Sequence, residues 1–332
     1  MVSTEASLRR ELLNAGLTSR AIDAVWPEWW SSDAEVSLSA TAELRYTVAR
    51  RLGISPRSLF EGPPKFVWRD EAKFKNLGTT TPVEQFILTS FGIAAGRALI
   101  TAAPPALAPL PTTAVDLRRQ ILRSSPYVRL GDLLVACWGL GIPVVKTNIF
   151  PLERKRMQAI TVRLGNQYVI LIGRDSRFPA WIAFILAHEL GHIVRGHIDD
   201  SAALLEMDDP LQVPERDNEE LQADAFALAL LTGDEEPKII PGIERYSALQ
   251  VAEAVVRAAA QERIDPGVLA LCLAYGTGRW EESVGALKRI AEQELSEDVG
   301  IGVNRIANNE LDWDSTTSER AFYLHKILGI TA

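Results

Sequence analysis

A chain of 332 residues with 47% hydrophobic and 23% charged residues is long enough for two domains and apolar enough to bury a core. Its formal net charge of −8 argues against a general nucleic-acid coat or a membrane-surface protein, because both need a basic face, but a local DNA-reading module is not excluded. Two cysteines, Cys137 and Cys272, are too few for a disulfide framework and favour a reducing compartment.

Residues 1–12 predict no secretory signal, because they carry charged side chains throughout and no apolar h-region. Apolar stretches such as residues 180–187 are far too short to span a bilayer. We therefore expect a cytoplasmic protein without a membrane partner.

The first part of the chain, residues 1–101, is predicted to be an all-α module. Residues 7–15 form an amphipathic helical pattern, and residues 41–52 form a second one that ends in a glycine and proline stop. Residues 82–100 form a third helical pattern. Between the first two lies the sequence Trp-Pro-Glu-Trp-Trp at 26–30, which fits no regular element.

Residues 102–111 are the clearest linker in the chain. Four of these ten residues are proline, which favours an extended connector. We place a domain boundary there, followed by a second domain over 112–295 and a mixed, acidic C-terminal extension over 296–332 to which the sequence assigns no role. Limited proteolysis is expected to cut near the linker and leave a fragment that starts at about residue 112.

After the linker the pattern changes to short β runs mixed with helices, which is typical of an α+β fold. Three runs rich in apolar and β-branched residues, 142–146, 158–163 and 168–172, predict strands. Gly165 and Asn166 tolerate positive φ and predict a hairpin between the last two, giving a short antiparallel sheet. Helical patterns cover residues 117–122, 130–140, 179–194, 219–231, 248–262 and 281–294.

One segment, Ala-His-Glu-Leu-Gly-His, ends at His192 and lies within an apolar helical pattern. His188 and His192 are four residues apart, so both imidazoles lie on one face of a helix, one turn apart. Two neutral ring nitrogens at this spacing can take two corners of a tetrahedral zinc site. An exposed polar face of an ordinary helix is the alternative. The apolar flanks argue against it, because a buried His-Glu-His set is costly without a compensating partner.

Glu189 is the candidate catalytic residue of this segment. It lies about 100° round the helix from His188, so it cannot easily join both histidines as a ligand. It can border the open metal position and act as general base toward zinc-bound water.

Glu220 is the predicted third ligand, because a catalytic zinc needs three protein ligands and one position for water. It opens the pattern Glu-Leu-Gln-Ala-Asp, 28 residues after His192. Asp224 shares its helical face and can accept the proton of the second nitrogen of a ligand histidine, which fixes the tautomer. Glu219 is the competing ligand, and an acidic helix start without metal is the other alternative.

The remaining histidines and cysteines have simpler interpretations. His197 follows Gly196 and is interpreted as a helix-end or surface histidine, and His325 as a structural one. Cys137 and Cys272 lie in apolar helical patterns and are interpreted as buried inert thiols. A thiolate that caps the zinc in a latent form is the alternative.

These residues, in this order, resemble the ImmA/IrrE family of zinc metallopeptidases over roughly residues 117–280. The resemblance implies a zincin-like peptidase domain with zinc as cofactor, in which active-site helices lie beside a short sheet. The family often has Asn where this chain has Asp224, a change that keeps the hydrogen-bonding role. The similarity rests on residues 141–144, the hairpin that ends in 168–172, the helix of 187–192, the helix of 220–231, and residues 264–268.

Members of that family are typically cytoplasmic bacterial or phage proteins that cleave a helix-turn-helix repressor, and many are fused to such a domain. Residues 15–18 and 49–60 are similar to the first turn and the last helix of an Xre-like helix-turn-helix domain. Residues 26–30 fall where the recognition helix would begin. Nine Lys/Arg balance nine Asp/Glu over residues 1–70, so no basic footprint for DNA is visible. A degenerate module that binds protein and a DNA reader both remain open.

We therefore expect a zinc-dependent endopeptidase that cleaves a specific cytoplasmic protein, with a helix-turn-helix transcriptional repressor as the expected substrate. The substrate would lie extended along an edge offered by the strand at 168–172. Trp29 and Trp30 are either anchors for that partner or part of a small helical core.

Two other functions remain as alternatives. One is a transcription regulator or toxin–antitoxin-type binding protein with a structural or vestigial metal site, and the other is a metal-dependent hydrolase of a non-peptide substrate. Glu189 distinguishes the peptidase from the first alternative, because a purely structural metal site needs no general base.

Overall fold

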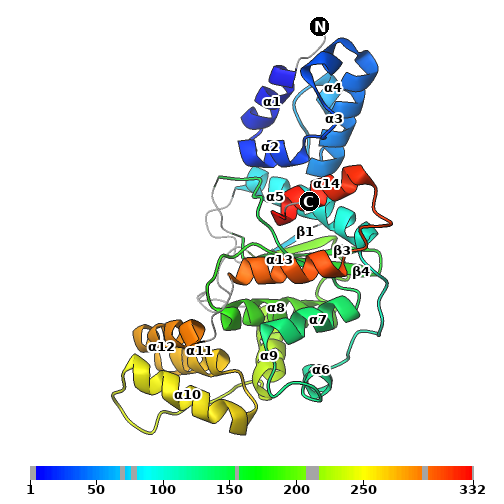
Figure 1. The fold of residues 1–332 in the computed structure, drawn as a ribbon. Helices are drawn as coiled ribbons and strands as arrows, with labels where there is room; N and C mark the ends of the chain where they lie inside the picture. The colour runs from blue at the N-terminus through cyan, green and yellow to red at the C-terminus, as the bar shows by residue number, and fades with distance from the viewer. Residues whose placement is uncertain are drawn as a thin grey trace.

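The computed structural model describes residues 5–67, 72–75, 81–153, 157–206, 217–293 and 298–330. The N-terminal helices and the group α10–α12 lie at opposite ends of an elongated molecule, with the sheet between them (Figure 1). The helices and strands are α1 (Glu5–Asn14), α2 (Ser19–Val25), the 3-10 helix η1 (Ser32–Val36), α3 (Leu38–Leu52), α4 (Ser58–Glu61), β1 (Ala72–Lys75), α5 (Pro82–Ala102), α6 (Ala114–Ile121), α7 (Leu130–Gly139), β2 (Val144–Lys146), β3 (Ala159–Leu164), β4 (Gln167–Ile172), α8 (Pro179–Val194), β5 (Ala203–Glu206), α9 (Asn218–Thr232), α10 (Ala248–Glu262), α11 (Pro266–Thr277), α12 (Trp280–Gln293), α13 (Val299–Glu310) and α14 (Ser318–Leu328).

The five strands form one sheet in the order β1-β5-β3-β4-β2. The predicted hairpin is present: β3 and β4 pair antiparallel, and Gly165 in the turn between them has a φ of 63°. The sheet is mixed rather than purely antiparallel as expected, because β1 runs parallel to β5 and β2 runs parallel to β4. The sequence patterns predict neither β1 nor β5.

The expectation that residues 168–172 form a free edge is wrong. They belong to β4, which is hydrogen-bonded to β3 on one side and to β2 on the other. Within the described strands, the edges of the sheet are β1 and β2. A strand paired on both sides has no backbone groups left to bind an extended substrate.

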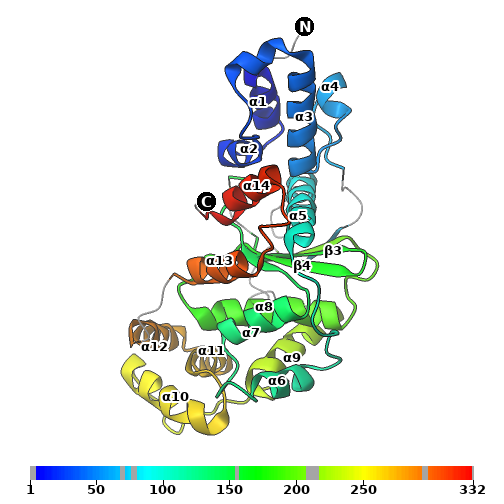
Figure 2. The ribbon, with the colours of Figure 1, turned by 45° about the vertical axis from the view of Figure 1, so that its right-hand side comes forward.

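Alternation along the strands divides the interior between the two faces of the sheet. In β4, Ile170 and Ile172 pack into a cluster with α7, α8 and α9, whereas Val169 and Leu171 pack into a second cluster with α5. This period of two is what a sheet covered on both faces requires. Figures 1 and 2 show α8 on one side of the sheet and α5 on the other.

α5 lies close against the sheet because two glycines let it approach. A Cβ on Gly92 would come within 3.0 Å of the Ile160 side chain, and one on Gly96 within 3.2 Å of the Val162 side chain. Within the described residues α5 is also the one helix long and apolar enough to cross a membrane, which corrects the expectation that all apolar stretches are too short. In this fold 67% of its most apolar stretch is buried, as in the core helix of a folded domain.

The Pro-rich segment 102–111 does not mark a break in the packing. It is a connector held by a hydrogen bond from Leu107 N to Gly139 O (2.8 Å). The helix before it, α5, packs against strands that come after it in the chain, so the two sides of the connector share one core cluster. The domain boundary placed there stays a prediction about independent folding, and this packing argues against it.

A fragment that starts at residue 112 is therefore expected to be insoluble or to unfold without cooperativity. It lacks the buried side chains of α5, among them Ile87, Phe91 and Leu99, at about 1.5–3 kcal/mol each, which together approach the whole stability of a domain. A fragment over 82–332 keeps them and is expected to be the more soluble of the two. Thermal unfolding of both would check this, and a cooperative, metal-binding fragment 112–332 would restore the linker as the boundary.

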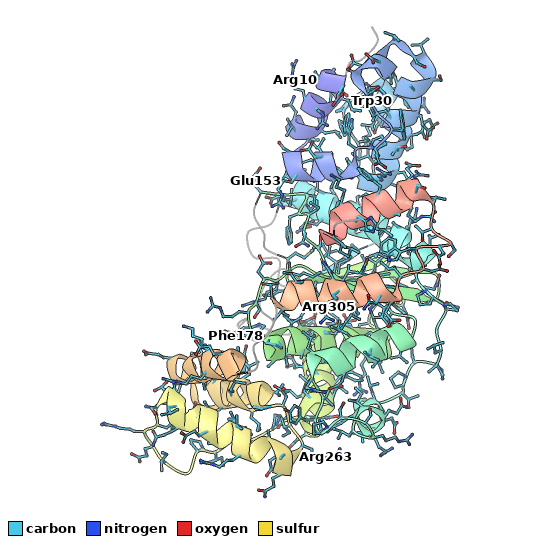
Figure 3. All side chains as sticks on the ribbon, in the orientation of Figure 1. Arg10, Trp30, Glu153, Phe178, Arg263 and Arg305 are labelled. Carbon is cyan, nitrogen blue, oxygen red and sulfur yellow. The ribbon has the colours of Figure 1, made fainter. Side chains whose placement is uncertain are left out.

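No α-helix begins at residues 26–30, where the resemblance to a helix-turn-helix domain would place the start of a recognition helix. These residues form a turn, and η1, a 3-10 helix of five residues, follows it. Trp30 fits the interpretation as part of a helical core, because its indole N–H donates to Glu5 Oε2 (2.8 Å). Trp29 fits the interpretation as an anchor for a partner, because it remains 42% exposed. Figure 3 shows Trp30 among the side chains of these helices.

The C-terminal extension is part of the folded core in its described range, 298–330. Asn304 of α13 accepts a hydrogen bond from Lys146 N of β2 (2.8 Å) and donates to Lys146 O (2.7 Å). Arg51 of α3 donates to the backbone oxygen of Glu319, next to the start of α14 (2.9 Å). The extension thus ties the edge of the sheet to the N-terminal helices.

Candidate metal centre

α8 carries the histidine motif on a helix that is buried along most of its length. Pro179 occupies the first turn, where its missing N–H is not needed, and the described backbone leaves the helix at Arg195. The apolar residues between them make α8 a central element of one of the two core clusters. A helix held in this way fixes the positions of the side chains that it carries.

α8 and α9 cross at very close range beside the motif. A Cβ on Gly191 would come within 3.0 Å of the backbone of Ala223 and within 3.2 Å of the Phe226 side chain. Glycine in one helix and alanine in the other therefore allow the two backbones to approach. This brings the acidic face of α9 against the histidine face of α8.

At this crossing the structure brings together His188, His192 and Glu220, as predicted. Their nearest ligand atoms all lie within 4.8 Å of one another. The two Nε2 atoms are 3.0 Å apart, and the Glu220 carboxylate lies 3.5 Å from His188 Nε2 and 3.4 Å from His192 Nε2. All three side chains are buried.

This donor set fits a zinc ion. Two imidazole nitrogens and one carboxylate are the ligands of many catalytic zinc sites, with bonds of about 2.0–2.2 Å. Tetrahedral geometry then requires ligand atoms about 3.3–3.5 Å apart, close to the 3.0–3.5 Å observed here. A buried cluster of two histidines and a glutamate also gains from a cation that compensates the lost hydration.

Asp224 takes the predicted position behind the first ligand. Its Oδ1 lies 2.9 Å from Nδ1 of His188. With Nε2 directed at the cluster, Nδ1 carries the proton and donates a hydrogen bond to the Asp224 carboxylate, which fixes the tautomer and the ring orientation. The competing ligand Glu219 is not in the metal-ligating group. Its carboxylate forms an ion pair with Lys73 instead (3.1 Å).

His197 is a residue whose role the sequence interpretation missed. It is buried rather than on the surface, and its Nδ1 lies 2.9 Å from Nδ1 of His192. Since Nε2 of His192 faces the cluster, its Nδ1–H donates to His197. The second nitrogen of His197, Nε2, then carries a proton and donates to Gln222 Oε1 (3.1 Å). His197 thus fixes the tautomer and ring orientation of His192, as Asp224 does for His188.

Replacing His197 by Phe is expected to weaken zinc binding about 10–100-fold, because the ring of His192 loses its acceptor while the space stays filled. Competition against a chromophoric chelator measures this directly. His325→Phe is the matched control, since His325 packs against Trp313 away from the cluster. An unchanged affinity in His197→Phe would show that this histidine only fills space.

Glu189 is turned toward the sheet rather than toward α9. The hydroxyl of Thr161 on β3 donates to its Oε2. Glu189 is 0% exposed, and the three candidate ligands are no more than 2% exposed. In this conformation the whole group is closed to solvent.

Neither cysteine belongs to the metal-ligating group among the described residues. Both thiols are buried, and burial raises the pKa of Cys272 to about 12 and that of Cys137 further still. They are therefore thiols at neutral pH, as the interpretation of inert buried cysteines expects. The alternative of a thiolate that caps the metal finds no support in this geometry.

Residues 176–265 match the family model described as Peptidase U49. This segment covers somewhat more than a quarter of the chain and contains α8, α9 and the whole candidate metal centre. No curated protein and no solved structure matches the chain. The family match supports a peptidase, while the narrower resemblance to the ImmA/IrrE family stays a prediction.

Proposed function

We propose that this protein is a zinc-dependent endopeptidase that cleaves a specific protein. The observation that carries the proposal is the convergence of His188, His192 and Glu220 inside the segment that matches a peptidase family. Three protein ligands leave one coordination position for a substrate or water, which is the pattern of catalytic rather than structural zinc sites.

Glu189 is the proposed general base. A bound zinc ion would supply Lewis-acid chemistry, polarising the peptide carbonyl and lowering the pKa of water to about 7. The Glu189 carboxylate accepts the proton of the attacking water and later donates it to the leaving amine. The hydroxyl of Thr161 orients this carboxylate through its hydrogen bond to Oε2.

The closed site favours a selective enzyme. Every side chain assigned to the chemistry is at most 2% exposed, so an unstructured peptide has no direct path to it in this conformation. A specific partner that stabilises an open conformation would supply the missing access, as population shift requires. We therefore propose low activity on generic peptides and a requirement for one partner.

A helix-turn-helix repressor in the cytoplasm remains the proposed substrate, on the strength of the ImmA/IrrE resemblance. The N-terminal helices favour contact with protein over DNA reading. Trp29, Val36 and Leu38 are exposed apolar side chains around η1, and the balanced charge of this region offers no basic face. Exposed aromatic and aliphatic residues of this kind anchor protein interfaces.

The burial of the ligands also fits the second candidate, a regulator with a structural metal site. The two candidates differ in what Glu189 does. A structural site needs no base, whereas the peptidase loses its chemistry without one.

The test is co-expression of the intact protein with repressor-like proteins encoded beside its gene, with purified casein as a generic substrate. The proposal expects one partner to be cut and casein to remain intact. Free cleavage of casein with no neighbour cut would replace the selective enzyme with a general peptidase. No cleavage of any kind, with zinc retained, would favour the structural site.

A further inference from the structure

A cavity of about 350 Å³ lies between the first half of α8, the second half of α9 and α11. Its walls are apolar and aromatic, formed by Trp181, Phe184, Leu228, Leu271 and Tyr275 among others. Charged side chains occur at one rim, where the chain passes through Glu235, Glu236 and Lys238. In Figure 3 the label Phe178 marks the start of α8, the helix whose first half lines the cavity.

The cavity begins one helical turn from the ligand His188 on α8 and two turns from the ligand Glu220 on α9. Phe184 precedes His188 by four residues, and the two ring centroids are 6.2 Å apart. Leu228 follows Asp224 by four residues on the same face of α9. The wall of the cavity therefore contacts a candidate ligand histidine directly.

Aromatic contacts hold the walls in place. Trp181 packs against Trp280 with ring centroids 6.1 Å apart, and Arg174 lies over the Trp181 ring at 4.7 Å. Tyr275 meets the same Trp280 edge to face at 4.5 Å. A space framed in this way is preformed, which lowers the cost of binding.

We propose that this cavity is the specificity subsite of the peptidase and receives a large apolar side chain, such as Leu, Met or Phe, of the substrate. The inference rests on the proposed function. A cavity of about 150 Å³ already binds a benzene ring, so this volume holds any of the three. A charged side chain would lose its hydration among these walls without gaining a partner.

The position of the cavity fixes which substrate residue enters it. One helical turn is about 5.4 Å, and an extended peptide advances about 3.3 Å per residue. The side chain in the cavity therefore belongs to a residue within about two positions of the scissile bond. The chain cleaves beside large apolar residues, whatever protein carries them.

The experiment uses the full-length zinc protein and hydroxamates, which bind a metal through their own oxygens. Acetohydroxamate tests the metal alone, and two succinyl hydroxamates that differ only in a methyl or an isobutyl side chain test the cavity. Calorimetry is expected to show that the isobutyl compound binds at least about tenfold more tightly than the methyl compound, because apolar pockets discriminate on this scale. A carboxymethyl compound should gain nothing over the methyl one.

Leu228 is the residue to vary, because it is only partly buried and lines the cavity. Leu228→Trp fills the space and is expected to abolish the isobutyl preference while acetohydroxamate still binds. Leu228→Ala enlarges it and should shift the preference toward a phenylpropyl side chain, which keeps the test open if the Trp variant does not fold. Val256→Trp on the exposed side of α10 is the matched control and should leave the preference intact.

The outcomes separate the two proposals. Equal binding of the methyl and isobutyl compounds, or a preference unaffected by either Leu228 variant, would overturn the subsite and leave the proposed function standing. Failure of acetohydroxamate to bind the zinc-loaded protein, both alone and with its protein partner present, would overturn the open metal position, and with it both proposals.

Discussion

Glu189→Gln is expected to retain fold and zinc and to lose cleavage of the protein partner by about 10²–10⁴-fold. The amide has the shape of the carboxylate and can still accept the hydrogen bond from Thr161, but it cannot take a proton from water. Cleavage rate, zinc content and thermal unfolding of the variant would be measured together.

Glu253→Gln is the matched control for this change, because Glu253 is exposed on α10, away from the cluster. It is expected to cleave at the wild-type rate. Undiminished cleavage by Glu189→Gln would remove Glu189 from the chemistry. Loss of cleavage together with loss of zinc would instead make it a structural support of the site.

Removing the metal is expected to lower the melting temperature by about 6 °C relative to protein in excess zinc. A ligand that binds only the folded state at about 1,000 times its Kd stabilises it by about 4 kcal/mol. For a chain of this length that corresponds to about 6 °C. Scanning calorimetry before and after chelation, and again after zinc is restored, measures the shift.

His188→Ala is the control for chelation, since it removes one donor of the cluster. Its melting temperature should no longer respond to zinc. A zinc-dependent shift of equal size in this variant would place the responding metal elsewhere in the molecule.

The sequence was sufficient to predict the core of the metal centre because its determinants are local. The four-residue spacings of His188 and His192 and of Glu220 and Asp224 are fixed by helix geometry alone. What spacing could not decide was the choice between Glu219 and Glu220. That choice depends on how α9 is rotated against α8, which the contact between Gly191 and Ala223 sets.

His197 was missed although a signal was present. Gly196 has a φ of 74°, and after it the N–H of His197 bonds to the carbonyl of His192 (3.0 Å). This is the glycine-terminated helix end in which the residue after the glycine folds back onto the last turn. Gly196 predicts a helix exit from the sequence, and the fold-back after it is what turns the side chain of His197 toward His192.

The strand pairing of the sheet and the position of α5 could not be predicted from local residue spacing. β2 has three residues and β5 has four, and their pairing with β4 and β3 depends on contacts between distant segments. The prolines of 102–111 suggested a boundary by composition. The stronger indication was α5 itself, since a helix that is apolar on all sides requires burial on all sides.

The central claim is most directly tested by zinc analysis of the purified wild type beside His188→Ala and Glu220→Ala. The account predicts one zinc per chain in the wild type, bound to two imidazoles and one carboxylate at about 2.0–2.2 Å by X-ray absorption, and a marked loss of zinc in both variants. Near-stoichiometric zinc in both variants, or a wild type that binds none, would contradict it.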